Sequence, residues 1–360
     1  MAPSIRRSES VMRQPTVPVI EGAYFNDLMA QPDALKATFS HLARDGAWRA
    51  AKGFVVDRAW RRIVLTGMGS SYHALHPLNL ALVAAGFTPI MIETAELVHY
   101  ALPLCDADTL VILVSQSGRS AESLRLLDAN QYAAILGVTN TPDSPLAKRA
   151  NLSLMTQAGA EFSVSCKTYV TTMLALAWLG AIVSAQGERG ALARLSPAAQ
   201  QVAEYLAKWR QHVDELGRLL DGSRHLFLAG RGRSLATVGT GALIVKESSH
   251  VHAEGMSSAA FRHGPLEMLQ DDMTTIVFDG DEPTRTLNQR LASQLNSEGF
   301  RCNQVGVDAK LESLRIPACD AELLPILEIL PVEMMTLALA GLAGREAGKF
   351  EHASKVTETE

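Results

Sequence analysis

Short continuous runs of hydrophobic residues recur along the first part of the chain. They are IVLTG at 63–67, PIMIE at 89–93, LVILV at 110–114 and AAILGVT at 133–139. Continuous runs rich in Val and Ile are typical of central strands that are buried on both faces of a parallel sheet. Stretches that mix apolar and polar residues lie between them, at 71–86 and 120–130, and are predicted to be helices. This alternation predicts an α/β fold in which helices connect the strands of a parallel sheet.

Three further segments are predicted to be helical. An N-terminal helix is expected from about 23 to 45, and a long charged helix from about 196 to 220 should connect the two halves. The segment at 168–185, TYVTTMLALAWLGAIVSA, carries no charge over 18 residues, which is borderline for a membrane span. Because it has three threonines near its start and a glycine in the middle, we expect a buried core helix and no contact with a membrane.

The pattern of the first half restarts in the second half. VLTGMGSS at 64–71 is echoed by FLAGRGRS at 227–234, and TLVILVSQSG from Thr109 is echoed by TTIVFDGDEP from Thr274. Two copies of one α/β unit account for the length of the chain. The copies differ in one respect, because Ser115 and Ser117 correspond to Asp279 and Asp281. An acidic loop would repel an anion, so we expect an anion only in the first copy.

Composition and charge exclude several classes of protein. With 360 residues and 47% hydrophobic residues, the chain can build two domains. A net charge of -5 and the lack of a basic stripe argue against nucleic acid as a partner. The four cysteines are far apart and form no CxxC pair, which argues against a zinc site or disulfides and indicates a reducing, cytoplasmic environment. The first 20 residues are polar and do not resemble a signal peptide. We expect neither a metal nor a cofactor.

Serine-rich loops follow two of the predicted strands. The run at 110–114 passes directly into SQSGRS at 115–120, and GSS at 69–71 follows the first run. Ligands of parallel sheets lie beyond the carboxyl ends of the strands, where the next helix offers unpaired N–H groups and the positive end of its dipole. Serine is also an ordinary helix cap, but two such loops at one sheet edge favour an anion site. Gly118 would let the chain turn there without a Cβ. Neither loop has a nucleotide-binding glycine pattern.

Several motifs together resemble the sugar isomerase (SIS) domain family. In the first half they are GMGSS at 67–71, SQSGRSAES at 115–123, GVTNTPDSPLAKRAN at 137–151 and AGAEFSVSCKTY at 158–169. In the second half they are FLAGRGRS at 227–234, GALIVKESSHVHAEG at 241–255, FRHGPLE at 261–267 and KVTETE at 355–360. This second set resembles the tandem isomerase half of glucosamine-6-phosphate synthase and its stand-alone relatives. The resemblance implies two tandem SIS domains, each a flavodoxin-like parallel sheet flanked by helices.

The resemblance also implies roles for individual residues. Glu247 matches the carboxylate that moves a proton between C1 and C2 of the sugar. His263 matches a histidine that assists ring opening and that the neighbouring subunit contributes, which implies a homodimer. Lys355 matches a lysine of a C-terminal tail that closes over the sugar. The residues implied to bind the phosphate or the sugar are Ser70, Ser71, Ser115, Gln116, Ser117, Ser120, Ser165 and Lys167.

The expected chemistry agrees with these residue types. One carboxylate can take a proton from one carbon and return it to the next, and a histidine exchanges protons readily near neutral pH. A lysine can stabilise a developing oxyanion or form an imine with the open-chain carbonyl. We expect glutamine not to be the nitrogen source, because residue 1 leads almost directly into the sugar-binding half. Amination is also in doubt, because Ile244 and Thr240 replace a lysine and a glutamate of the synthase.

Three functions remain open. The first is deamination of glucosamine-6-phosphate to fructose-6-phosphate and ammonia, which we favour. The second is an aldose–ketose isomerase or a deglycase that acts on another phosphosugar. The third is a module that senses a phosphosugar without converting it.

The expected organisation of the chain follows from the repeat and the resemblance. We expect a loose tail, a first SIS domain with the anion site, a connecting helix, a second SIS domain and a catalytic C-terminal tail, at 1–21, 22–195, 196–222, 223–345 and 346–360.

Overall fold

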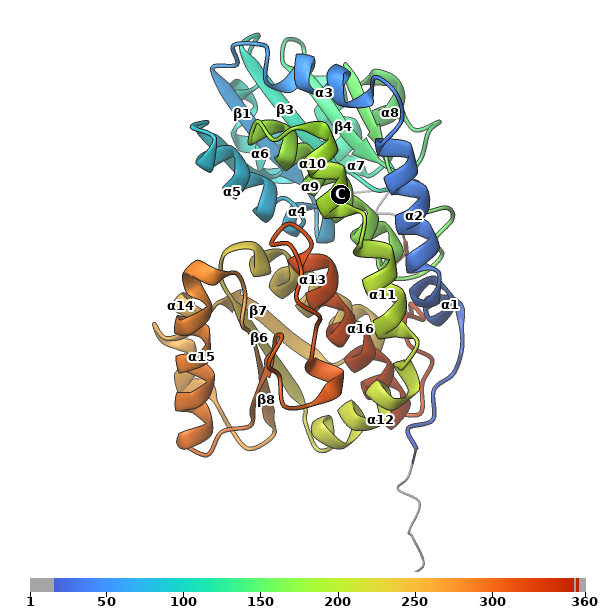
Figure 1. The fold of residues 1–360 in the computed structure, drawn as a ribbon, viewed down its shortest axis with the longest axis vertical. Coiled ribbons are helices and arrows are strands. Elements are labelled where there is room, and N and C mark those ends of the chain that lie inside the picture. Colours follow the sequence, from blue (N-terminus) through green and yellow to red (C-terminus); the bar gives the residue numbers. More distant parts are fainter. Residues whose placement is uncertain (1–15, 353, 356–360) are drawn as a thin grey trace, which may run out of the picture.

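Each half of the chain builds one parallel sheet with helices on both faces, and the two units are stacked along the long axis of the molecule (Figure 1). The computed structural model describes residues 16–352, 354 and 355. The strands at 63–67, 110–114 and 133–139 are confirmed, and their observed bounds lie within one residue of the predicted ones. Two parallel sheets flanked by helices confirm the predicted fold class.

The first sheet has the strand order of a flavodoxin-like fold, β2-β1-β3-β4-β5. Its strands are β1 (Arg62–Gly67), β2 (Pro89–Glu93), β3 (Thr109–Val114), β4 (Ala134–Thr139) and β5 (Leu152–Met155). Its helices are α3 (Ala47–Val55), α4 (Ser70–His73), α5 (His76–Ala84), α6 (Thr94–Tyr100), η1 (Leu102–Leu104), α7 (Ala121–Ala129), α8 (Pro145–Arg149) and α9 (Lys167–Val183). Ile63 and Leu65 enter the main core, while Val64 enters a smaller core with Leu97 of α6 and Leu126 of α7.

The structure corrects two predictions about this domain. The strand at 89–93 was expected to be central, but it is the edge strand of the sheet and its residues are half-buried or exposed, because it pairs with β1 alone. The predicted helix at 71–86 is divided into α4 and α5. Pro77, near the start of α5, has no N–H to donate to the carbonyl of His73, so one continuous helix would lose a hydrogen bond there.

The second sheet has the order β7-β6-β8-β9. Its strands are β6 (His225–Gly230), β7 (His252–Ser257), β8 (Met273–Phe278) and β9 (Cys302–Val305). Its helices are η2 (Gly232–Ser234), α13 (Leu235–Ser249), α14 (Ser258–Phe261), η3 (Pro265–Met268), α15 (Glu282–Ser297), η4 (Glu312–Leu314) and α16 (Leu324–Leu342). The proposed repeat agrees with this arrangement, since β1 and β3 occupy the same places in their sheet as β6 and β8 do in theirs.

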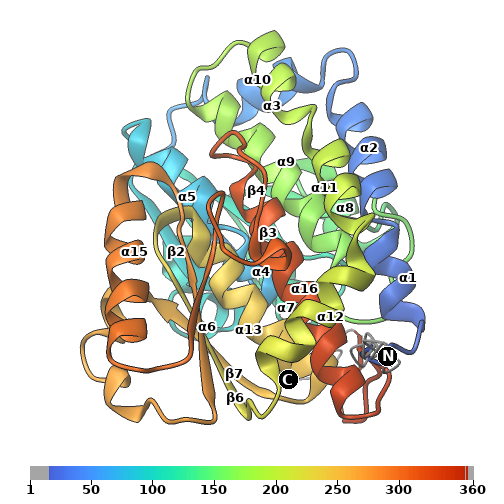
Figure 2. The ribbon, with the colours of Figure 1, turned by 60° about the horizontal axis from the view of Figure 1, so that its bottom comes forward.

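Two apolar helices form the centre of the molecule. Every residue of α9 is buried, so the predicted core helix is confirmed over 168–183, whereas residues 184 and 185 lie beyond its end and are exposed. We did not single out α16, yet it is the helix of the described chain that is long and apolar enough to cross a membrane. Its most apolar stretch is fully buried, and it packs against both α13 and α12 (Trp209–Leu220), as Figure 2 illustrates. Burial on this scale identifies α16 as a second core helix.

The helices that connect and flank the domains are shorter than predicted. The N-terminal helix is divided into α1 (Ala23–Met29) and α2 (Gln31–Leu42), and the connector into α11 (Ala198–Leu206) and α12, after α10 (Glu188–Leu195). Residues 1–21 were expected to be loose, and 1–15 lie outside the described residues. Val17, however, is buried, and its N–H donates to Asp214 Oδ1 of α12 at 2.9 Å. The described end of this segment is therefore attached to α12 of the connector.

Candidate active site

A cavity of about 400 Å³ lies at the carboxyl ends of β1 and β3. Three loops of the first domain, one helix of the second domain and the C-terminal tail contribute to it. Its lining includes these residues predicted from the sequence: Ser70, Ser71, Gln116, Ser120, Ser165, Glu247 and Lys355. Side chains that are separated by almost 300 positions in the sequence thus surround one space.

The first serine loop is positioned by an unusual backbone turn. Gly69 has a φ of 52° and lies two residues after the end of β1 at Gly67, and α4 begins directly after it at Ser70. A left-handed φ of this kind suits glycine, which has no Cβ to clash with the next carbonyl. The turn therefore places Ser70 and Ser71 at the edge of the sheet, where both line the cavity.

The second serine loop turns at Gly118, as the sequence predicts. Gly118 has a φ of 59°, and a Cβ at this position would lie 2.3 Å from Ser144 Oγ. Ser120 caps α7, where its Oγ accepts the N–H of Ser123 at 3.4 Å. Gln116 and Ser120 line the cavity, whereas Ser115 is buried and Ser117 accepts the N–H of Arg119 at 3.2 Å. The loop thus presents two of its predicted residues to the cavity and holds the other two in its own turn.

The third loop lies before α9, and an ion pair between the first residue of α9 and helix α1 stabilises it. Lys167 Nζ lies 2.7 Å from Asp27 Oδ1 of α1, with both side chains almost fully buried. Asp27 Oδ2 in turn accepts the N–H of Phe162 at 3.2 Å. Ser165 faces the cavity and exchanges a hydrogen bond with Thr168 at 2.9 Å. Ser165 therefore lines the cavity, whereas Lys167 lies outside its lining and stabilises the loop through its ion pair with Asp27.

Glu247 reaches the cavity from the last turns of α13, together with Leu243 one turn earlier. Helix α13 packs against α4 of the first domain, and a Cβ on Gly239 would lie 2.3 Å from the ring of His73. Burial raises the pKa of Glu247 above its ordinary value, and the ammonium groups of Lys355 and Lys246 oppose this shift. A carboxylate whose pKa is shifted toward neutrality is suited to act as a general base.

The C-terminal tail closes one side of the cavity. The N–H of Gly348 donates to the carbonyl of Ser248 at 2.9 Å, and Ser163 Oγ donates to the carbonyl of Gly348. Phe350, Ser354 and Lys355 line the cavity. The rest of the KVTETE motif, 356–360, lies outside the described residues.

His263 does not join the other predicted catalytic residues in this chain. It is exposed and follows α14 in the second domain, and it is not among the described residues that line the cavity. The predicted role of His263 requires a second copy of the chain.

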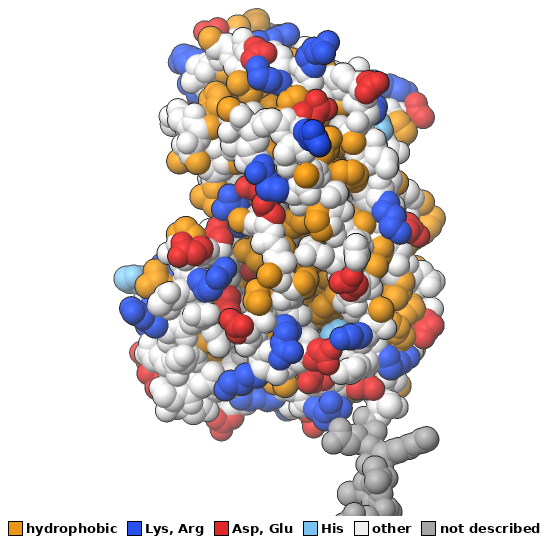
Figure 3. Space-filling view, in the orientation of Figure 1, with side chains coloured by type: hydrophobic (Ala, Val, Ile, Leu, Met, Phe, Trp, Pro, Cys, Tyr) orange, Lys and Arg blue, Asp and Glu red, His pale blue; other side chains and the backbone are white. Residues whose placement is uncertain are grey.

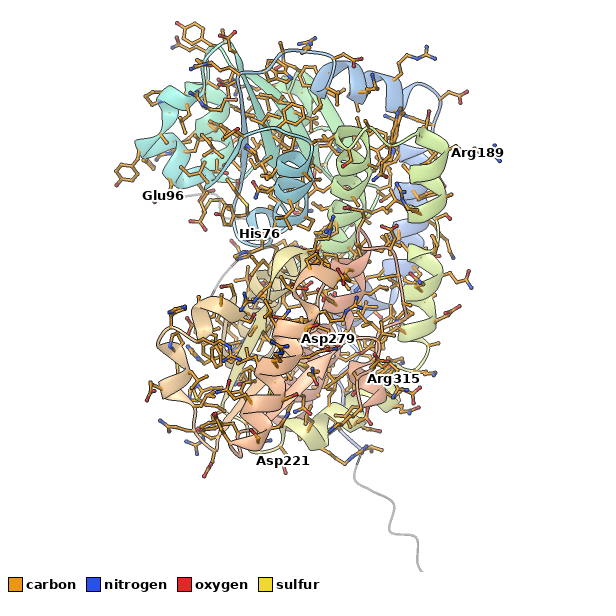
Figure 4. The ribbon with its side chains drawn as sticks, turned by 60° about the vertical axis from the view of Figure 1, so that its left-hand side comes forward. His76, Glu96, Arg189, Asp221, Asp279 and Arg315 are labelled. Atoms are coloured by element: carbon orange, nitrogen blue, oxygen red, sulfur yellow. The ribbon has the colours of Figure 1, made fainter. Side chains whose placement is uncertain are left out.

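The corresponding edge of the second sheet is acidic, as the repeat suggests. Asp279, labelled in Figure 4, accepts hydrogen bonds from Gln304 at 3.1 Å and Gln289 at 3.3 Å. Asp281 pairs with Arg233 at 2.8 Å. Two buried carboxylates at this edge disfavour an anion there, so the two sheets are chemically unequal.

Two residues of the site were not found from the sequence. Glu161 is buried beside the tail, and Glu122 lines the cavity two residues after Ser120, with no partner for its Oε2 among the described residues. Glu161 lies within the AGAEFSVSCKTY motif, so the motif was the available signal.

Within the described part of the chain, no group of His, Cys, Asp and Glu side chains could hold a metal ion. On the face seen in Figure 3, basic and acidic side chains are interspersed.

The chain is similar to proteins of phosphosugar metabolism. It is 31% identical to the glutamine–fructose-6-phosphate aminotransferase (isomerizing) of Thermococcus kodakarensis over 82% of this chain and 51% of that protein. The chain spans about half the length of the curated relatives it matches. A solved C-terminal domain of glucosamine-fructose-6-phosphate aminotransferase from Francisella tularensis superposes with a TM-score of 0.81 and 20% identity, covering 92% of this chain and 98% of that one. A glucosamine-6-phosphate deaminase from Thermotoga maritima superposes with a TM-score of 0.76 and 18% identity, covering 93% and 99%.

The family itself is established by a match to two segments of the chain. The SIS domain family model matches residues 58–181 and 219–323, one segment in each of the two α/β units. These segments contain both serine loops and the helix that carries Glu247, and together they cover more than half of the chain. The chain therefore belongs to the SIS domain family, with two SIS domains in tandem.

Proposed function

We propose that this protein is an enzyme that deaminates an amino sugar phosphate, converting glucosamine-6-phosphate and water to fructose-6-phosphate and ammonia. The observation that carries the proposal is the shared cavity, in which Glu247 and Lys355 face the serine loops at Ser70 and Gln116. Proteins of the same fold are named as an aminotransferase, a deaminase and isomerases of phosphosugars, which supports an enzyme of this class.

The phosphate group would bind at the serine loops. Ser70, Ser71, Gln116 and Ser120 supply hydroxyl and amide donors at the carboxyl edge of a parallel sheet, close to the N-terminus of α7. Hydroxyl donors and the positive end of a helix dipole favour an anion without requiring a lysine or arginine. The sugar would then extend from these loops toward Glu247.

Glu247 would move the proton between the two carbons. In the open-chain aldehyde form, Glu247 removes the proton from C2, and the electron pair of that bond forms a C1–C2 double bond as the carbonyl oxygen gains a proton. Return of that proton from Glu247 to C1, with loss of a proton from the nitrogen, leaves an imine at C2, which water hydrolyses to the ketone and ammonia. Catalysis by a positioned base of this kind typically contributes about 10²- to 10⁴-fold.

The first test is a product analysis with glucosamine-6-phosphate. We expect equal amounts of ammonia and fructose-6-phosphate. Conversion of another aldose phosphate to its ketose without ammonia would instead identify an isomerase, and thermal stabilisation by sugar phosphates without any product would identify a sensor. Either of these results contradicts the proposed deamination.

His263 would act on the cavity of a second copy of the chain. Its exposure at the end of α14 leaves it accessible to a partner, and imidazole is suited to exchange protons with the ring oxygen. We therefore propose a homodimer. When inactive Glu247→Gln and His263→Ala chains are mixed and allowed to exchange subunits, we expect activity to return, because hybrid dimers contain one site with both residues. An active species that light scattering identifies as a monomer would contradict this arrangement.

A further inference from the structure

Glu161 connects the sugar-contact loop to the C-terminal tail. Its Oε1 accepts the N–H groups of Cys166 and Thr168, each at 3.0 Å. Its Oε2 accepts the hydroxyl of Thr168 at 2.6 Å and the ammonium group of Lys355 at 2.5 Å. One carboxylate therefore holds both the turn around Ser165 and a lysine that is 194 positions away in the sequence.

Burial makes the loss of either partner of this ion pair more costly than it would be at the surface. The side chain of Glu161 has an exposed fraction of 0%, and that of Lys355 an exposed fraction of 22%. A buried carboxylate needs hydrogen-bond donors and a positive charge, because the interior does not solvate an anion. Five donors surround Glu161, including the thiol of Cys166 at 3.6 Å, and Lys355 is the only charged one of these five.

This contact limits the chemistry that is open to Lys355. An imine forms when the lone pair of a neutral amine attacks a carbonyl carbon, and an ammonium group has no lone pair. Lys355 and Glu247 line the same cavity, and the charge of Lys355 opposes the rise in the pKa of Glu247 caused by burial. An ammonium group in this position can donate to a sugar oxygen that becomes negative as Glu247 removes a proton.

We propose that Glu161 is a positioning residue that holds Lys355 in the cavity as an ammonium ion, so that Lys355 acts by charge and hydrogen bonding and forms no imine with the sugar. The proposal rests on the proposed function for its substrate, a phosphosugar with an open-chain carbonyl. It adds a division of roles, in which Glu161 touches the loop and the tail while Lys355 touches the substrate.

Reductive trapping tests the absence of an imine directly. The wild-type protein is incubated with fructose-6-phosphate or glucosamine-6-phosphate and sodium cyanoborohydride, and its mass and peptides are then measured. We expect no sugar adduct on Lys355, and an adduct on this residue would overturn the proposal.

Lys355→Arg keeps the positive charge and cannot form an imine, so we expect hydrogen exchange at C1 and C2 of the sugar to be about tenfold faster in this variant than in Lys355→Ala. An equal loss of this hydrogen exchange in Lys355→Arg and Lys355→Ala would also overturn the proposal.

Hydrogen exchange of the backbone tests the role of Glu161 without any turnover. Glu161→Gln keeps an oxygen for the two N–H groups of the loop but removes the negative charge that holds Lys355. We expect faster amide exchange at residues 349–355 and unchanged exchange in α9. Lys349→Ala, which removes an exposed lysine of the same tail, should leave the tail as in the wild type. Unchanged exchange of the tail in Glu161→Gln would overturn the proposal.

The two sets of measurements separate this inference from the proposed function. If no sugar phosphate is converted, the proposed deamination fails, while the trapping and amide-exchange results still decide the state of Lys355 and its anchor. If ammonia is released but Lys355 carries an adduct, the function stands and the inference fails.

Discussion

At the scale of single residues, the site depends on how the surroundings of Glu247 shift its pKa. Burial raises its pKa, and Lys355 and Lys246 lower it. Lys355 lines the cavity, whereas Lys246 is exposed and is not among the described residues that line it. Both lysines therefore act on the same carboxylate, and Lys246 can be changed without removing a side chain that lines the cavity.

Lys246→Ala should shift the acid limb of the pH–rate profile to higher pH. A base must be deprotonated to act, and loss of a nearby positive charge raises the pKa of Glu247, so more alkaline conditions are needed to ionise it. The measurement is kcat/KM against pH for the proposed reaction. Lys246→Arg keeps the charge and should leave the limb in place. A limb that stays in place in Lys246→Ala would contradict the effect of Lys246 on Glu247, and the Glu247→Gln variant then decides whether Glu247 is the base.

Glu247→Gln tests the same residue by loss of function. The amide keeps the size of the side chain but cannot accept the proton, so exchange of C1 or C2 hydrogen with deuterated water should fall by about 10²- to 10⁴-fold. Thermal stabilisation by sugar phosphate should remain, because the serine loops are unchanged. Exchange at the wild-type rate would exclude Glu247 as the base.

At the scale of elements, the second serine loop depends on the backbone of Gly118. Gly118 has a left-handed φ, which is strained for any residue with a Cβ. A Cβ at this position would also lie 2.3 Å from Ser144 Oγ and 3.1 Å from Leu146 Cβ. Gly46 is a matched comparison, since its φ is 81° but nothing lies within 4 Å of an added Cβ. The difference between the two positions therefore isolates the steric contact with α8.

Gly118→Ala should destabilise the protein more than Gly46→Ala does. The left-handed backbone alone costs an alanine about 1–2 kcal/mol, and the contact with Ser144 adds to this at Gly118. Urea unfolding measures the stability, and thermal stabilisation by sugar phosphate measures the site. We expect that stabilisation to fall in Gly118→Ala only. Equal effects of the two substitutions on both measurements would contradict the role of this turn.

The elements differ in how far the sequence predicts them. Short strands such as β3 are predicted closely, because continuous Val and Ile runs need burial on both faces and polar loops end them at once. The helix breaks at Ala30 and at 207–208 were not predicted, although Pro32 in the first turn of α2 has no N–H to donate and was a signal for the first of them. The serine loops are found from their place after strands. The contact between Glu161 and Lys355 is not, because it joins residues 194 positions apart.

At the scale of the whole molecule, the core contains two carboxyl groups on α16. Glu328 accepts the hydroxyl of Ser234 at 2.9 Å, and Glu333 accepts the amide of Gln31 at 2.7 Å. Each has one further oxygen without a partner among the described residues. Burial raises the pKa of both groups to about 8, so the folded protein keeps protons that the unfolded chain releases at a lower pH.

This difference predicts how stability depends on pH. A carboxyl group whose pKa is raised by folding contributes stability that is fully present below its unfolded value of 4.5 and is lost as pH rises through its folded value of about 8. The free energy of unfolding should therefore decline more steeply between about pH 4.5 and about pH 8 in the wild type than in Glu328→Gln or Glu333→Gln, which cannot ionise. Urea unfolding at several pH values measures it, with the exposed Glu204→Gln as a control that should follow the wild type. Parallel curves for all four proteins would mean that neither carboxyl group is protonated in the core.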